Sequence, residues 1–252
     1  MDNLNAFMVG RIAIRVIVVD GPVGSSAKFT VQEIARVLAD TLEAQAMLQR
    51  LAATNRPRVP LQFASWSGVV TITTPPSFPA LSSQVSKKDT EDREKLWRDE
   101  ALLKLVAFGG TAGLMKLRNA TIGGADHAFT VFWTKYECGL PAYTRPLGPH
   151  IVMCWPWLVA RRGPLSPSTD TVLAHEIGHI FGAADEYKGC TKLTADGLGY
   201  GKLNHPNHNC EEFNVSPDPC LMRMVPNRYC NDTRKHVGWI DSNKDGILDV
   251  LQ

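Results

Sequence analysis

The spacing of apolar residues changes along the chain and predicts strands and helices in alternation. Residues 11–19 (RIAIRVIVV) form a nearly continuous apolar run, which is typical of a buried strand. Residues 61–74 are rich in β-branched side chains and predict one strand, straight or bulged around Gly68. The apolar segments 129–136 and 151–155 predict two further strands.

Other segments show helical periodicity. A capping box formed by Thr30 and Glu33 predicts a helix that continues to about residue 51. A second helix is predicted over residues 89–108, a third over residues 168–182, and a short one near residues 231–238. The residues predicted to face the core are Val31, Ile34, Ala35, Leu38 and Leu42 in the first helix and Leu96, Leu103 and Ala107 in the second.

The order of these elements predicts an α+β fold, in which helices pack on a mixed, twisted sheet. A looser glycine-rich stretch is expected after residue 108. Periodicity fades after Tyr187, where a segment rich in Pro, Asn and Gly begins. We therefore expect an upper α/β lobe over residues 1–183 and an irregular lower lobe over residues 184–252.

Composition narrows the functional class. Hydrophobic residues make up 44% and charged residues 21% of the chain, as in ordinary globular proteins, so disorder is not expected. The net charge of +2 is too small to favour nucleic acid or an anionic membrane as a partner. No apolar run is long enough to span a membrane, and the first residues lack the pattern of a signal peptide. We expect a monomer.

Six cysteines all lie in the second half of the chain. They could be buried thiols, but four of them crowd the irregular segment, which favours disulfides and an exported or extracellular protein. The expected pairing joins Cys138 to Cys154 and pairs Cys190, Cys210, Cys220 and Cys230 among themselves.

The strongest chemical signal is the string HEIGHIFGAADEY at residues 175–187. His175 and His179 are four residues apart, so both imidazoles project from one face of a helix and can bind Zn²⁺. Glu176 beside them can act as the general base for a metal-activated water. Gly182 permits a tight turn that would bring Asp185 to the third ligand position. Three protein ligands leave a fourth position open, as in catalytic zinc sites.

Glu186 is an alternative third ligand, because it directly follows Asp185. If Asp185 is the ligand, Glu186 is expected to accept a hydrogen bond from a histidine N–H. Tyr187 belongs either to the core or to the wall of the cleft.

The spacing H-E-x-x-H-x-x-G-x-x-D resembles the metzincin clan of zinc peptidases, in the snapalysin-like form with aspartate as third ligand. The resemblance implies zinc ligation by His175, His179 and Asp185, and a methionine turn beneath the metal at Met222. It also implies a metzincin-like fold whose edge strand, residues 129–136 or 142–153, pairs with a protein or peptide substrate. Met224 departs from the family, in which several members have a tyrosine that steadies the oxyanion.

A second metal motif closes the sequence. Residues 241–249 (DSNKDGILD) resemble short calcium loops, with Gly246 at the turn. The predicted calcium ligands are Asp241, Asn243, Asp245, the backbone carbonyl of Ile247, and Asp249.

The sequence thus favours a zinc-dependent endopeptidase with Glu176 as its catalytic residue. The alternative is a catalytically silent surface or binding module that keeps its metals for stability. A weaker alternative is a hydrolase of non-peptide amides.

Overall fold

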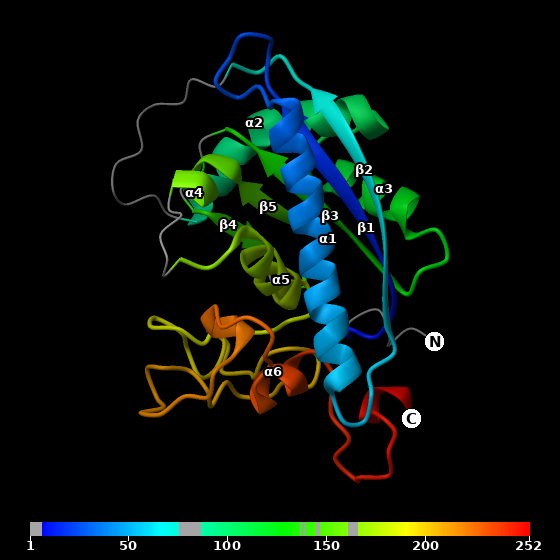
Figure 1. The fold of residues 1–252 in the computed structure, drawn as a ribbon, viewed down its shortest axis with the longest axis vertical. Helices are drawn as coiled ribbons and strands as arrows, with labels where there is room; N and C mark the ends of the chain where they lie inside the picture. The colour runs from blue at the N-terminus through cyan, green and yellow to red at the C-terminus, as the bar shows by residue number, and fades with distance from the viewer. Residues whose placement is uncertain (1–6, 76–86, 137, 139, 145–146, 161–165) are drawn as a thin grey trace.

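The computed structural model describes residues 7–75, 87–136, 138, 140–144, 147–160 and 166–252. Its centre is a five-stranded mixed sheet with the strand order β2-β1-β3-β5-β4 (Figure 1). The strands are β1 (Gly10–Asp20), β2 (Leu61–Thr71), β3 (His127–Thr134), β4 (Ala142–Thr144) and β5 (His150–Cys154). Strands β1, β2, β3 and β5 run parallel to one another, whereas the short edge strand β4 runs antiparallel to β5.

Helices cover both faces of the sheet (Figure 1). The α-helices are α1 (Val31–Thr54), α2 (Lys87–Val106), α3 (Gly110–Ile122), α4 (Trp155–Ala160), α5 (Thr169–Ile180) and α6 (Asn231–His236). Short 3-10 turns occur at Leu221–Arg223 and Asp249–Leu251. The predicted α+β class is confirmed.

Strand β1 shows why the sheet has a core on each side. Ile12 and Ile14 point into the larger core, which α1 and α5 cover, whereas Ile17 and Val19 point into a second core beneath α2 and α3. Alternate residues of a strand face opposite sides, so a strand covered on both faces reads as a continuous apolar run. The larger core continues past α5 to Met222 and Trp239, so the lower segment packs on the same apolar layer.

The predicted strands agree closely with those in the structure. Strand β2 pairs with β1 in unbroken register from Leu61 to Thr71, so no bulge forms at Gly68. Strand β3 is central and buried along its whole length, which excludes residues 129–136 as the edge strand. Within the described part of the chain, Ala142–Thr144 takes that place.

The predicted inward faces of the helices were right only in part, since Ile34 and Leu38 of α1 pack against the larger core. In α1, Val31 and Leu42 are exposed, and the helix instead buries a face that includes Asp40, Thr41 and Gln45. Because these buried residues are polar, the hydrophobic pattern of the sequence did not reveal this face. Contacts within the helix satisfy some of the polar groups, such as the ion pair of Asp40 with Arg36 at 2.7 Å.

The inward face predicted for α2 was wrong. Leu96 and Leu103 are exposed, while Trp97 and Leu102 are buried. The buried face also carries an ion pair between Glu94 and Arg98. Because these two residues are charged, the hydrophobic pattern did not reveal that they lie on the buried face. Helix α3 occupies the stretch expected to be loose, and it buries Leu114 and Leu117 against the second core.

Two disulfides form, and one predicted pair does not. Cys138–Cys154 is confirmed, and Cys190–Cys210 agrees with the expected grouping. Cys220 and Cys230, expected to form the third bond, are free and buried. No helix among the described residues is long and apolar enough to cross a membrane.

One carboxylate anchors α2 to the end of β2 and makes stability depend on pH. Glu100 accepts hydrogen bonds from the backbone and hydroxyl groups of Thr73 and Thr74 at 2.5 to 2.7 Å. Burial raises the pKa of Glu100, but these bonds outweigh it and lower the pKa to about 2. Since the folded-state pKa is depressed, this stabilisation is complete above the ordinary glutamate pKa and is lost as pH falls towards 2.

We therefore expect Glu100→Gln to flatten the pH dependence of unfolding between about pH 5 and 2, because one pKa unit corresponds to about 1.4 kcal/mol. Urea denaturation at several pH values measures this slope. Glu43→Gln, which changes an exposed glutamate of α1, is the control. A Glu100→Gln slope equal to that of the wild type would contradict the assignment.

Candidate metal centre

Helix α5 carries the two histidines on its inner face. Ser168 precedes the helix as its N-cap, and every residue from Thr171 to Ile180 is buried. His175 and His179 lie one turn apart, with ring centroids 4.7 Å from each other. The rings therefore face a common point.

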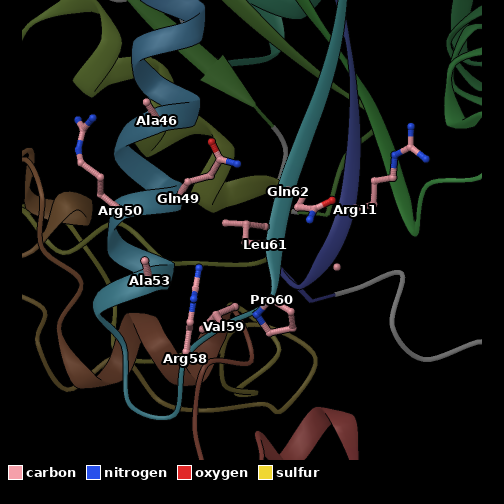
Figure 2. A pocket seen from close by; sticks show the side chains of 11 residues that line it. Arg11, Ala46, Gln49, Arg50, Ala53, Arg58, Val59, Pro60, Leu61 and Gln62 are labelled. Carbon is pink, nitrogen blue, oxygen red and sulfur yellow. The ribbon is translucent and has the colours of Figure 1, made fainter.

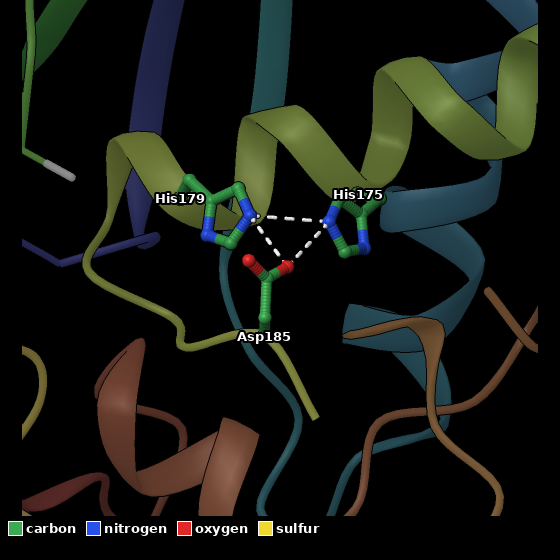
Figure 3. A group of neighbouring side chains, drawn as sticks. All are labelled: His175, His179 and Asp185. Atoms are coloured by element: carbon green, nitrogen blue, oxygen red, sulfur yellow. Dashed lines mark hydrogen bonds and ion pairs between the residues drawn. The ribbon is translucent and has the colours of Figure 1, made fainter. Parts of the chain in front are cut away.

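The chain turns back under this helix at Gly182. Its φ of +83° lies in the left-handed region, and a Cβ there would stand 2.7 Å from the Cα of Gly201. The turn brings Asp185 beneath the rings (Figure 3). Its Oδ1 atom lies 3.0 Å from Nε2 of His175 and 3.1 Å from Nε2 of His179.

Backbone carbonyls fix the orientation of both rings. Nδ1 of His175 lies 3.1 Å from the carbonyl oxygen of Leu221, and Nδ1 of His179 lies 2.7 Å from that of Ala183. A carbonyl can only accept, so we assign the ring proton to Nδ1 in each case. With the proton on Nδ1, the Nε2 atom of each ring can offer its lone pair to a metal ion. This arrangement of outer hydrogen bonds is typical of metal-binding histidines.

The three facing atoms are spaced as metal ligands are. The two Nε2 atoms are 3.1 Å apart, and each is about as far from the Asp185 oxygen. Tetrahedral ligands that lie about 2.0–2.2 Å from zinc are separated by roughly 3.4 Å, close to these values. His175, His179 and Asp185 therefore form a group that could hold a metal ion.

In the absence of a metal, a proton serves the same purpose. Burial lowers the pKa of His179, but the hydrogen bond to Asp185 and the charges of Asp185 and Glu176 raise it to about 9. Burial raises the pKa of Asp185, yet hydrogen bonds from both histidines hold it well below its usual range. Metal binding at neutral pH would release the His179 proton.

Glu176 faces a hollow next to the three ligands. Together with His179, Asp185 and Tyr187 it lines a cleft of about 140 Å³, whose opposite wall is formed by the edge strand β4. A neighbouring hollow of about 230 Å³ continues past Tyr187 towards Lys188 and Tyr200. Glu176 is 6% exposed, so it lies in a largely water-excluded position at the base of the cleft.

Tyr187 lines the cleft and does not belong to the core. Its ring is 41% exposed and stacks on His175 with the centroids 6.1 Å apart. Burial of the hydroxyl and the charge of Asp185 raise the pKa of Tyr187, so the phenol keeps its proton and remains a hydrogen-bond donor.

The expected role of Glu186 was wrong. This side chain is fully buried and turns away from the histidine rings. It accepts hydrogen bonds from Nδ2 of Asn209 at 2.7 Å and from Oγ1 of Thr233 at 2.8 Å. Backbone carbonyls, and not Glu186, accept from the histidine N–H groups. Glu186 ties the turn after α5 to the lower segment.

Met222 lies directly beneath the motif helix. Its sulfur is 2.9 Å from the position that a Cβ on Gly178 would occupy, so a larger residue at 178 would force the Met222 side chain to shift. The backbone of the same turn positions the site, because the Met222 carbonyl accepts from the N–H of Glu186 at 3.0 Å. Tyr229, the alternative oxyanion donor, is buried against Trp239 and lines neither hollow of the cleft.

The loop over residues 241–249 has internal order of the kind that calcium loops show. The carboxylate of Asp241 accepts from the backbone N–H groups of Asp245 and Gly246 at 3.2 and 2.9 Å. Asp249 accepts from the N–H of Ser242 at 2.8 Å. These bonds fix the turn without showing an ion, so calcium binding remains a prediction.

We expect calorimetry to show Ca²⁺ binding that Asp241→Ala removes, because Asp241 supplies the first oxygen of the loop. Asp196→Ala, at an exposed position outside the loop, should bind as the wild type does. An absence of heat at millimolar Ca²⁺ would leave the loop as a polar turn.

A larger pocket lies elsewhere. About 960 Å³ opens between the C-terminal half of α1 and the start of β2 (Figure 2). Its polar side chains are Arg11, Arg50, Arg58, Gln49 and Gln62. None is a general base or a metal ligand at neutral pH, so the smaller cleft beside Glu176 is the better candidate for chemistry.

No protein-family model and no curated protein matches this chain. A solved structure described as a chaperone–substrate complex aligns with 79% of the chain at 15% identity and a TM-score of 0.34. The aligned part spans 29% of that solved chain. A likeness at this level carries no argument about fold or function, so the case rests on the residues themselves.

The structure also brings together residues that sequence reasoning missed. His205, His208 and Asp232 form a second group with the geometry of a metal site, and Glu186, Cys220 and Cys230 form a third. The H-x-x-H spacing at residues 205–208 was the available signal for the second group, but its carboxylate lies far along the chain.

Proposed function

We propose that the protein is a zinc-dependent endopeptidase of the metzincin type. The proposal rests chiefly on one observation, that His175, His179 and Asp185 direct three acceptor atoms at a common point beside Glu176. The donor set fits zinc, because two imidazoles and one carboxylate are ligands that Zn²⁺ accepts and that Ca²⁺ or Mg²⁺ would not select. A bound zinc ion would polarise the scissile carbonyl and acidify a water molecule.

The protein groups supply the remaining steps. The Glu176 carboxylate would take the proton of the attacking water and later give it to the leaving amine. The hydroxyl of Tyr187 hydrogen-bonds to Asp185, and it would become a donor to the substrate carbonyl by turning from Asp185 towards the cleft. Tyr187 would thus supply a donor that the sequence lacks at Met224.

The cleft suits an extended peptide. Ala142, Tyr143 and Thr144 of the edge strand line the hollow that contains Glu176. An extended substrate can add to an edge strand as a further strand of the sheet. This placement favours a peptide bond over a small amide as the substrate. The two disulfides favour an exported enzyme.

The test is casein hydrolysis by the purified protein before and after treatment with a zinc chelator. We expect activity to disappear with the metal and to return when Zn²⁺ is added back. A protein that binds zinc, loses thermal stability on chelation and never cleaves casein or peptide libraries would instead be the silent, metal-stabilised module.

A further inference from the structure

We propose that His205, His208 and Asp232 bind a second divalent ion of the zinc class, separate from the candidate active site. The three ligand atoms lie within 4.8 Å of one another. Nε2 of His205 is 2.8 Å and Nδ1 of His208 is 3.8 Å from Oδ1 of Asp232. Separations of this size match roughly 3.4 Å between tetrahedral ligands, so small side-chain movements would complete the site.

The chemistry of the ligands selects the ion. Two imidazoles with one carboxylate favour zinc or a similar first-row ion over calcium or magnesium, which prefer oxygen ligands. His205 and Asp232 are largely enclosed, with side-chain exposures of 18% and 11%, whereas His208 is 53% exposed. The site is therefore anchored on its inner side and open to solvent at His208, where an ion can enter and a water can complete the coordination.

The backbone holds these ligands in place. The second carboxylate oxygen of Asp232 accepts from the N–H of Asn209 at 2.8 Å. The backbone of His205 pairs with Tyr200 in an isolated β-bridge, and its carbonyl oxygen lies 3.0 Å from Nε2 of His236. Outer contacts of this kind orient metal ligands before the ion arrives.

The position of the cluster indicates a structural role. The same segment carries two buried asparagines between and beside the histidines. Asn207 donates to the backbone carbonyl of Asp185 at 2.7 Å, and Asn209 donates to the carboxylate of Glu186 at 2.7 Å. An ion that fixes this segment to α6 would also fix the backbone of Asp185, the third ligand of the candidate active site.

The experiment measures zinc per chain by mass spectrometry after equilibration with a small excess of Zn²⁺ over the sites and removal of unbound metal by gel filtration. We expect His208→Ala to bind one equivalent less than the wild type, while His150→Ala, which removes an imidazole outside both clusters, binds as the wild type does. The double variant His175→Ala/His179→Ala should keep the ion that His208→Ala removes. This arm tests the second site even if the first binds no metal.

A ligand exchange provides an independent test. In His208→Cys loaded with Co²⁺, the new thiolate should give a sulfur-to-cobalt charge-transfer band that the wild type lacks. Equal zinc content in the wild type and His208→Ala would overturn the proposal. So would Co²⁺-loaded His208→Cys without this band.

Discussion

Glu176→Gln is expected to lower casein hydrolysis by a factor on the order of 10²–10⁴, the usual contribution of a general acid–base. The substitution keeps the size of the side chain and removes only its ability to take and return a proton. Zinc content and thermal stability should change little, because the atoms that face the metal position belong to His175, His179 and Asp185. Kinetics on a fluorogenic peptide library, with zinc analysis of the same sample, measure both quantities.

The control for this experiment is Glu43→Gln, at an exposed position on α1. It should retain the activity of the wild type. If Glu176→Gln hydrolyses peptides at more than about a tenth of the normal rate, another group must act as the base. If both proteins are inactive but bind zinc, the silent-module alternative gains support.

The core of the candidate site could be predicted because its geometry is local. His175, Glu176 and His179 lie within two turns of one helix, so their spacing fixes their shared face. Gly182 predicts a turn at the end of the helix by a similar short-range rule, and the turn determines the position of Asp185. Residues six or fewer positions apart need no knowledge of the rest of the fold.

The predictions failed for two reasons, contacts between distant segments and polar residues on buried helix faces. The hydrogen-bond donors to Glu186 are Asn209 and Thr233, and no rule of sequence spacing connects them to it. The buried face of α2 and part of that of α1 were missed because each contains polar side chains, some of which form ion pairs within the helix itself. Hydrophobic periodicity reports burial only where the buried residues are apolar.

The same reasoning explains the second histidine cluster. His205 and His208 are close in sequence, but Asp232 reaches them only through the packing of α6 against an irregular segment. Stability and chemistry in this lower segment therefore depend on buried polar contacts more than on regular structure. Glu186 is at the centre of these contacts and offers the clearest test of their importance.

Glu186→Ala is expected to destabilise the protein by about 3–5 kcal/mol, since an unsatisfied buried donor costs about 1–3 kcal/mol. The carboxylate accepts from Asn209 at 2.7 Å, Thr233 at 2.8 Å and the thiol of Cys230 at 3.0 Å. Its removal would leave these three donors without an acceptor in a buried region and would leave a cavity between them. Urea denaturation of the metal-free protein measures the loss without any contribution from zinc.

Two further variants separate the hydrogen bonds from the volume of the side chain. Glu186→Gln fills the same space but places an amide donor against groups that also donate, so it should lose an intermediate amount of stability. Asp196→Ala, at an exposed position in the same segment, should change stability by no more than about 0.5 kcal/mol. A loss below about 1 kcal/mol for Glu186→Ala would mean that water replaces the carboxylate, and that Asn209 and Thr233 do not depend on it.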